Sequence, residues 1–159
     1  MTDIASLPYR PCAGVMLLNR AGQVFVGQRL DSVLEAWQMP QGGIDPGEAP
    51  IDAAWRELWE ETGVRRDLAE LIAEAPGELY YDLPEDLVGK VWKGKWRGQR
   101  QRWFLFRFLG EDADVDIQTA EPEFRAWRWA APQDLPDIIV PFKRALYKEL
   151  LTVFGQHLV

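Results

Sequence analysis

The apolar residues of this chain change their spacing several times, which predicts a mixture of strands and helices. The apolar runs 14–18 and 23–29 are joined by Asn19-Arg20-Ala21-Gly22, a composition that is typical of a hairpin turn. Residues 102–108 alternate between two faces, as expected of a strand. The other predicted strands cover 37–40, 78–82 and 124–129.

Two further segments have the spacing of amphipathic helices. Pro50 suits the first turn of a helix and Gly63 suits the position after the last turn, so a helix is expected between them. Its buried stripe is expected to contain Ile51, Ala54, Trp55, Leu58 and Thr62. A second helix is expected to begin near Pro141 and to end at Gly155. Its inward-facing residues are predicted to be Phe142, Ala145, Leu146, Leu150 and Phe154.

The first predicted helix carries three carboxylates on a face of their own. Glu57, Glu60 and Glu61 are spaced i, i+3 and i+4, so their like charges repel one another. Two of them are also near the helix C-terminus, where the helix dipole disfavours anions. Arg56 offsets only part of this cost, whereas a bound divalent cation offsets it better, and oxygen ligands favour Mg²⁺ or Mn²⁺ over zinc. The alternative is a solvated acidic helix face, which is common.

The loop before this helix favours the metal site over the solvated face. Residues 40–48 read Pro-Gln-Gly-Gly-Ile-Asp-Pro-Gly-Glu, which is too rich in glycine and proline to continue a helix. The pair Gly42-Gly43 lets the backbone approach a ligand or a metal closely. A loop of this kind that leads into a carboxylate helix is hard to explain as an ordinary surface loop without a function.

Length and composition limit the class of protein. The 159 residues, of which 47% are hydrophobic and 27% charged, are sufficient for one ordinary globular domain. No apolar run approaches the roughly 18 residues of a membrane span, and residues 1–8 lack the features of a signal peptide. Cys12 is the only cysteine and is expected to be a small buried residue, so a reducing, cytoplasmic location is expected. The only histidine is His157, which disfavours Ser-His-Asp and zinc–histidine mechanisms.

The charges are distributed unevenly along the chain. The formal net charge is −7, which disfavours a polyanionic partner, but residues 89–107 contain seven Lys or Arg residues and no Asp or Glu. Aromatic residues are interleaved with these cations, among them Trp92, Trp96, Trp103 and Phe104. This pattern favours a partner that combines nucleobases with phosphates. The alternative is that Trp103 and Phe104 belong to the strand core, and that the other two anchor a loop.

The segment from Gly42 to Val64 resembles the Nudix box. The resemblance is carried by Gly42, Glu48, Arg56-Glu57-Leu58, Glu60-Glu61 and Gly63-Val64. It implies a Nudix-type α/β fold, an α/β/α sandwich around a mixed β-sheet, formed by a single domain over residues 1–159. Further blocks resemble the bacterial RNA pyrophosphohydrolases and the asymmetric dinucleoside tetraphosphate hydrolases. These blocks are Tyr9-Arg10-Pro11, 37–43, 98–105, Pro122-Glu123-Phe124 with Trp127, and Phe142-Lys143-Arg144. The loop with Trp92 and Trp96 is more similar to the tetraphosphate branch.

The resemblance also implies roles for individual residues. Catalytic Mg²⁺ ions, with Mn²⁺ as a substitute, are expected on Glu57, Glu60, Glu61 and the backbone carbonyl of Gly42. Glu123 is expected to be another metal ligand or the general base, and Arg56 to orient Glu57 or Glu60. Substrate contacts are expected from Arg10, Arg29 and Lys143 with phosphates, from Phe142 with a base, and from Gln101 and Trp103. Glu48 is expected to brace the loop. Glu123 as a sheet-edge charge and Arg29 as an ordinary surface residue are the alternatives.

The chemistry expected from these residues is metal-dependent hydrolysis of a P–O–P link in a nucleoside polyphosphate. One candidate substrate is the 5′ end of triphosphorylated RNA, which would lose pyrophosphate and keep a monophosphate. The other is diadenosine tetraphosphate, cut asymmetrically to ATP and AMP. A non-catalytic nucleotide-sensing module is the alternative from a different class, although a sensor has no need of all three glutamates. No membrane association and no obligate protein partner are predicted.

Overall fold

A computed structural model describes residues 4–32 and 35–158; residues 1–3, 33–34 and 159, which the single-domain prediction includes, lie outside the described residues. The described strands are β1 (Tyr9–Leu18), β2 (Val24–Arg29), β3 (Trp37–Gln38), β4 (Gln41–Gly43), β5 (Ala69–Glu74), β6 (Leu79–Asp82), β7 (Gly98–Phe108) and β8 (Phe124–Ala130). The α-helices are α1 (Pro50–Thr62), α2 (Leu135–Ile138) and α3 (Arg144–Val153). Short 3₁₀ turns are η1 (Ile4–Ser6), η2 (Arg66–Leu68), η3 (Trp92–Gly94), η4 (Asp112–Asp114), η5 (Pro132–Asp134), η6 (Pro141–Lys143) and η7 (Gly155–His157).

The two longest strands, β1 and β7, form the centre of a mixed sheet. They run parallel over their whole length, from Tyr9 opposite Gly98 to Leu18 opposite Arg107. The main path of the sheet is β3-β2-β1-β7-β5, while β4 pairs with β1, β6 with β7 and β8 with β2. Because β4 pairs antiparallel with β1, Gly42 lies opposite Ala13 in the register. The glycine loop is therefore anchored directly to the central strand of the sheet.

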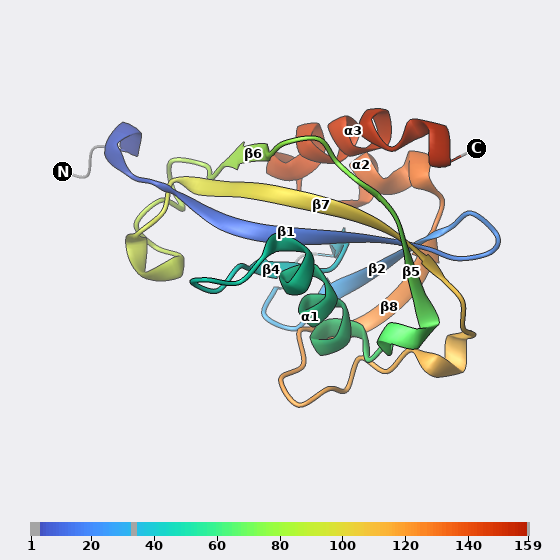
Figure 1. Ribbon diagram of the computed structural model, residues 1–159. Helices are drawn as coiled ribbons and strands as arrows, with labels where there is room; N and C mark the ends of the chain where they lie inside the picture. The colour runs from blue at the N-terminus through green and yellow to red at the C-terminus, as the bar shows by residue number, and fades with distance from the viewer. Residues whose placement is uncertain (1–3, 33–34, 159) are drawn as a thin grey trace.

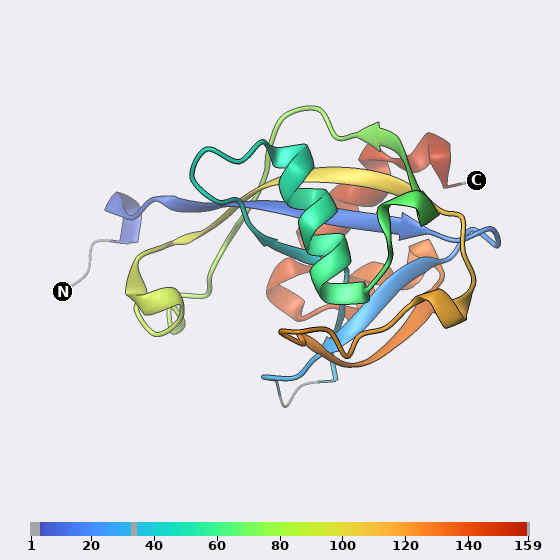
Figure 2. The same ribbon diagram turned by 60° about the horizontal axis from the view of Figure 1, so that its bottom comes forward.

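Helices cover both faces of this sheet, with α1 on one side and α2 and α3 on the other (Figure 1 and Figure 2). Alternate residues of the central strands serve the two faces, as the period of a strand requires. Val15 and Phe104 pack in the same cluster as Leu58 of α1. The neighbours Met16 and Leu105 pack in the other cluster, which includes residues of α3. The predicted α/β/α arrangement around a mixed sheet is confirmed.

Several predicted elements differ in extent from those in the structure. β1 and β7 begin earlier than predicted, at Tyr9 and Gly98, because the parallel pairing between them extends past the apolar runs. The predicted glycine loop contains β4, because it pairs with β1. β5 was not predicted, since its sequence AELIAE has no clean alternation. No helix formed by the described residues is long and apolar enough to cross a membrane.

The helix predictions hold for the main elements, with corrections at individual residues. On α1, Ala54, Leu58 and Thr62 are buried as predicted, while Ile51 and Trp55 are only partly buried. Glu57 and Glu61 also lie on the buried side, so the acidic face and the apolar stripe overlap. In the last helix the prediction for Ala145 was wrong: it is exposed, and Tyr147 is buried in its place beside the predicted Leu146.

We expect Gly14→Ala to destabilise the fold, because a Cβ atom at this position would overlap the indole ring of Trp103 from the paired strand. Overpacking of this kind costs about 1–3 kcal/mol of unfolding free energy. Gly155→Ala is the matched control, since nothing lies within 4 Å of the position of its Cβ. Urea unfolding of both variants measures the difference. Equal stability of the two variants would contradict the prediction, because it would show that the indole ring of Trp103 can move aside at no cost.

Candidate active site

A polar cavity of about 270 Å³ lies where β4, α1 and the segment before β8 meet. Three of its lining residues are the acidic Glu57, Glu60 and Glu61 from α1. Three others are the cationic Arg10, Arg29 and Lys143. The remaining lining residues are Gln38, Gln41, Gly42, Gly43, Trp92, Gln99, Glu121 and Glu123. The structure therefore brings together the glutamates and the three cations that the sequence assigned to one site.

Two of the α1 carboxylates are almost completely removed from water. Glu57 is 8% exposed and Glu61 is 2% exposed. Burial raises the pKa of Glu57, opposed chiefly by Arg56. Burial also raises the pKa of Glu61 well above 4.5, and the negative charges of Glu57 and Glu123 add to that shift. A desolvated pair of carboxylates is costly to the fold unless a positive charge joins them.

Arg56 holds the helix face and the loop together. Its guanidinium donates hydrogen bonds to both carboxylate oxygens of Glu48, at 2.9 and 2.8 Å, and lowers the pKa of that residue to about 2. It also donates to Glu57 at 2.8 Å, to Glu60 at 3.2 Å and to the carbonyl oxygen of Gly43 at 2.8 Å. This geometry fits the roles predicted for Glu48, as a brace of the loop, and for Arg56, as the residue that orients the glutamates.

The donor set of the cavity fits a divalent cation. The position of a Cβ on Gly42 is filled by the carboxylate of Glu57, so the loop backbone and this carboxylate are in direct contact. Glu61 Oε2 is buried and has no hydrogen-bond partner, which leaves a desolvated carboxyl oxygen available to a cation. Across residues 4–32 and 35–158, no three carboxylate, thiolate or imidazole groups converge on a ready-made metal position. Glu57 and Glu60 are instead paired with Arg56.

The three cations of the polar cavity are positioned by three different elements. Arg10 comes from β1, Arg29 from the end of β2 and Lys143 from η6. Arg29 forms an ion pair with Asp31 at 2.5 Å, so it is not an unpaired surface charge. Lys143 is 8% exposed, and burial together with the charge of Arg29 lowers its pKa to about 8. Close approach of like charges in a dry site favours binding of an anion.

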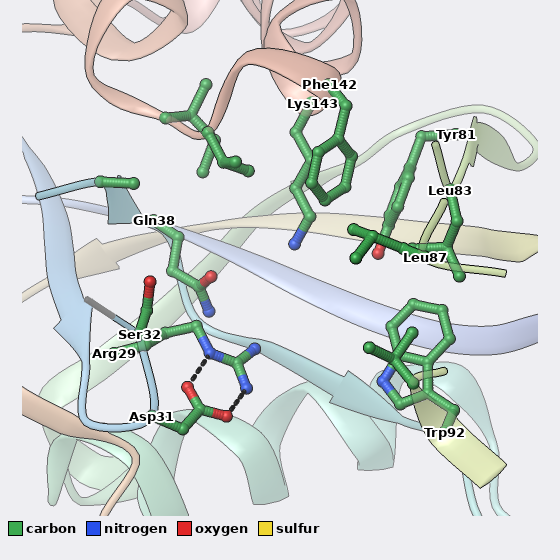
Figure 3. A pocket seen from close by; sticks show the side chains of 14 residues that line it. Arg29, Asp31, Ser32, Gln38, Tyr81, Leu83, Leu87, Trp92, Phe142 and Lys143 are labelled. Carbon is green, nitrogen blue, oxygen red and sulfur yellow. Dashed lines mark hydrogen bonds and ion pairs between the residues drawn. The ribbon is translucent and has the colours of Figure 1, made fainter. Parts of the chain in front are cut away.

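A second, more apolar cavity of about 370 Å³ adjoins the polar one (Figure 3). The two cavities share Arg29, Gln38, Trp92 and Lys143. The ring of Phe142 lies 5.8 Å from the ring of Tyr81, centroid to centroid. Tyr81 also carries a buried hydroxyl without a hydrogen-bond partner. Aromatic walls with a few polar groups are suited to a flat heterocycle.

Two predicted substrate contacts do not reach either cavity. Trp103 and Gln101 are each 1% exposed, lie on β7 and line neither cavity. Trp103 Nε1 donates to Gln101 Oε1 at 2.6 Å, and Gln101 Nε2 donates to Gln99 Oε1 at 2.7 Å. Only Gln99, at the end of this chain of hydrogen bonds, lines the polar cavity. For Trp103 and Phe104, the alternative of a place in the strand core is what the structure shows.

Other lining residues were not identified from the sequence. Tyr81 belongs to a predicted strand, and the alternation there puts Tyr81 inside while Tyr80 is 51% exposed. That alternation was a usable signal. Glu121 and Gln99 carry no comparable local pattern, because they reach the cavity through a loop and through strand pairing. Glu123, which was predicted, is exposed at the rim, where its carbonyl oxygen accepts a hydrogen bond from Leu30 N at 2.8 Å.

We expect the metal-free protein to lose stability as the pH rises above about 4.5. The folded state holds the proton of Glu61 more tightly than the unfolded chain does. The free energy of unfolding therefore falls as the pH rises from the ordinary pKa of a glutamate to the raised pKa of Glu61. Glu61→Gln should reduce this dependence, and Glu60→Gln, at a half-exposed side chain, should leave it in place. Urea unfolding in the presence of a chelator between pH 5 and pH 8 measures the slopes. Equal slopes in all three proteins would refute the desolvation argument.

Comparisons with known proteins agree with this site. The sequence matches the NUDIX domain over residues 8–150. It is 62% identical over 155 residues to a protein of Sphingopyxis alaskensis named RNA pyrophosphohydrolase, with 98% of each chain covered. It is 60% identical over 156 residues to the protein of the same name from Roseobacter denitrificans, again with 98% of each chain covered.

Solved structures share the fold. The binary complex of a C. elegans Ap4A hydrolase superposes with a TM-score of 0.66 at 22% identity, covering 92% of this chain and 98% of that one. The E. coli dihydroneopterin triphosphate pyrophosphohydrolase superposes with a TM-score of 0.68 at 19% identity, covering 93% and 99%. At these identities the likeness concerns the fold alone.

Nudix proteins generally use divalent metal ions, in agreement with the buried, unpartnered carboxylate oxygen of the polar cavity. The matched region includes both the glycine loop and the carboxylate helix. This chain therefore belongs to the Nudix family.

Proposed function

We propose that this protein removes pyrophosphate from the 5′ end of triphosphorylated RNA and leaves a 5′-monophosphate. The observation that carries the proposal is the adjacency of two cavities with different chemistry. The polar cavity suits a polyphosphate, and the aromatic cavity suits a nucleobase attached to it. Full-length relatives at 62% and 60% identity bear the name RNA pyrophosphohydrolase, which supports this substrate over other nucleotides.

The cation that we propose is Mg²⁺, with Mn²⁺ as a substitute. Glu57, Glu60 and Glu61 would hold it, together with the carbonyl oxygen of Gly42. When bound, it supplies neutralisation of phosphate charge and a more acidic water molecule. Arg56 keeps the carboxylate of Glu57 against the loop, and so maintains the shape of the ligand set before the substrate arrives.

The other residues of the site bind and orient the substrate. Arg10, Arg29 and Lys143, from three different elements, would contact non-bridging phosphate oxygens and position the P–O–P link beside the glutamates. Phe142, on the wall of the adjoining cavity, would stack on a base. Glu123 stands at the rim, where its carboxylate would be a further ligand or would accept a proton from the attacking water.

Asymmetric cleavage of diadenosine tetraphosphate to ATP and AMP is the second candidate. One observation favours it: Trp92 lines both cavities and offers a second aromatic surface, apart from the one that Phe142 provides. The non-catalytic sensing module is less well supported, since a sensor would gain nothing from the desolvated glutamates, whose burial is costly to the fold.

Matched assays of the two substrates test the proposal. With Mg²⁺ and equal concentrations, kcat/KM should be higher for pyrophosphate release from a 5′-triphosphorylated oligoribonucleotide than for ATP production from diadenosine tetraphosphate. The reverse order would favour the second candidate. Binding of both substrates without turnover of either would favour the non-catalytic sensing module.

Glu57→Gln should lower kcat by at least about 100-fold, because a carboxylate that acts on the metal or the water contributes about that much or more. The fold should remain intact, since the amide keeps the size of the side chain. Steady-state kinetics on triphosphorylated RNA measure the effect, and circular dichroism checks the fold. Glu149→Gln, at an exposed position of α3, is the control. Near-normal turnover of the Glu57 variant would exclude the helix face as the catalytic centre.

The pKa of Lys143 predicts a pH effect on substrate binding. Because this pKa is lowered to about 8, the free enzyme loses the positive charge of Lys143 above that pH. KM for triphosphorylated RNA should therefore rise between pH 7 and pH 9 in the native protein. Lys143→Arg keeps its charge throughout this range and should flatten the rise. A rise of the same size in both proteins would show that Lys143 does not contact the phosphates.

A further inference from the structure

The connection between β6 and β7 holds three of the chain's five lysines, Lys90, Lys93 and Lys95. All three are exposed, and the described residues give none of them an ion pair. We refer to these three residues as the lysine loop. In Figure 1 and Figure 2, the connection that carries η3 projects from the same end of the sheet as η1.

The arginines that follow the lysine loop are used differently. Arg97 pairs with Asp82 at 3.3 Å and Arg100 with Glu78 at 2.8 Å. A third pair joins Arg102 and Glu74. Three arginines of the cationic segment therefore pair within the protein, whereas its three lysines form no ion pair among the described residues.

The lysine loop is an exception in an acidic protein. The formal net charge is −7, yet residues 87–97 carry four cations and no Asp or Glu. Glu85 and Asp86 precede this stretch and are exposed. Unpaired cations that gather on one loop of an anionic protein attract a polyanion locally, while the remaining surface repels it.

Trp92 fixes the place of the lysine loop relative to the cavities. It lines the aromatic cavity (Figure 3) and also the polar one. Its ring lies 5.7 Å from the guanidinium carbon of Arg10. Among the described residues other than glycine, only Trp92 and Lys93 have positive φ angles, of 51° and 60°. Such angles cost free energy and occur where the surrounding structure requires them. Here they set the Trp92 ring between the two cavities, with exposed lysines on either side of it in sequence.

We propose that the lysine loop binds the phosphodiester backbone of the RNA nucleotides that follow the 5′ nucleotide. The inference rests on the proposed function, because it needs the 5′ end in the two cavities. An RNA chain that leaves them past Trp92 would meet the flanking lysines. Cations beside aromatic rings are the usual elements of single-strand binding, and the half-buried Trp96 adds another ring. A dinucleoside tetraphosphate has no phosphodiester and would leave the lysine loop unused.

Salt dependence of binding tests the proposal without catalysis. The probe is a single-stranded oligoribonucleotide of about 12 nucleotides with a 5′-monophosphate, followed by fluorescence anisotropy. The slope of log Kd against log salt changes by about 0.7 for each phosphate contact on a single strand. The variant Lys90→Gln/Lys93→Gln/Lys95→Gln should therefore lower this slope by about 2. An unchanged slope would overturn the proposal.

Kinetics separate the lysine loop from the catalytic site. In the triple variant, kcat/KM for a triphosphorylated RNA of about 12 nucleotides should fall about 10-fold at low salt, as the loss of several phosphate contacts implies. For diadenosine tetraphosphate and for a triphosphorylated dinucleotide it should stay within about twofold. Equal losses on long and short substrates would contradict the proposal, because they would place the lysines at the 5′ end instead.

A matched control removes the same charge from other parts of the surface. Arg20→Gln/Arg65→Gln/Lys148→Gln takes three exposed cations from positions outside the lysine loop. It should keep the native salt slope, and a slope reduced as far as in the lysine variant would overturn the proposal in favour of a general charge effect. If the native protein hydrolysed neither substrate, the proposed function would fail, while the anisotropy measurement would still decide whether the lysine loop binds RNA.

Discussion

The rest of the site depends on the removal of two carboxylates from water at the point where α1 packs against β4. Glu57 contacts the backbone at Gly42, and Glu61 lies deeper, with one oxygen unpartnered. Neither arrangement lowers the free energy of the metal-free fold, since desolvation and like charges both oppose it. The sheet supports this arrangement, because β4 pairs with β1 and thereby holds the glycine backbone in place.

The same anchoring explains how the cations come to line the same cavity as the carboxylates. Arg10 lies on β1, the strand that also pairs with β4. Arg29 is the last residue of β2, where the register of the pairing with β8 shifts. Next to it, the N–H of Leu30 donates to the carbonyl oxygen of Glu123 and holds that segment in place. Only Lys143 comes from the helical layer on the other face of the sheet. Strands supply half of the residues that line the polar cavity, whereas the aromatic cavity is closed by helical segments and by the β6–β7 connection.

The sequence was sufficient for the parts of the structure with local signals. The carboxylate helix, its glycine cap and the mixed order of elements follow from spacing and from turn residues, and α1 ends at Gly63 with a φ of 69°. The side chains of Gln101 and Trp103 could not be placed in this way. On a strand buried on both faces, alternation does not reveal which side chains reach a cavity at one end. The positions of Glu121 and Gln99 at the cavity, and the formation of β5, depend on contacts between segments that are distant in the sequence. No short stretch of sequence encodes such contacts.

The hydrogen-bonded row along β7 imposes a direction on the site. An indole nitrogen only donates, so the carbonyl of Gln101 must turn toward Trp103 and its amide nitrogen toward Gln99. The oxygen of Gln99 then already accepts one hydrogen bond, whereas its NH₂ group remains free to donate into the cavity. One core tryptophan thereby dictates that a neutral side chain presents hydrogen, rather than a lone pair, to whatever anion enters.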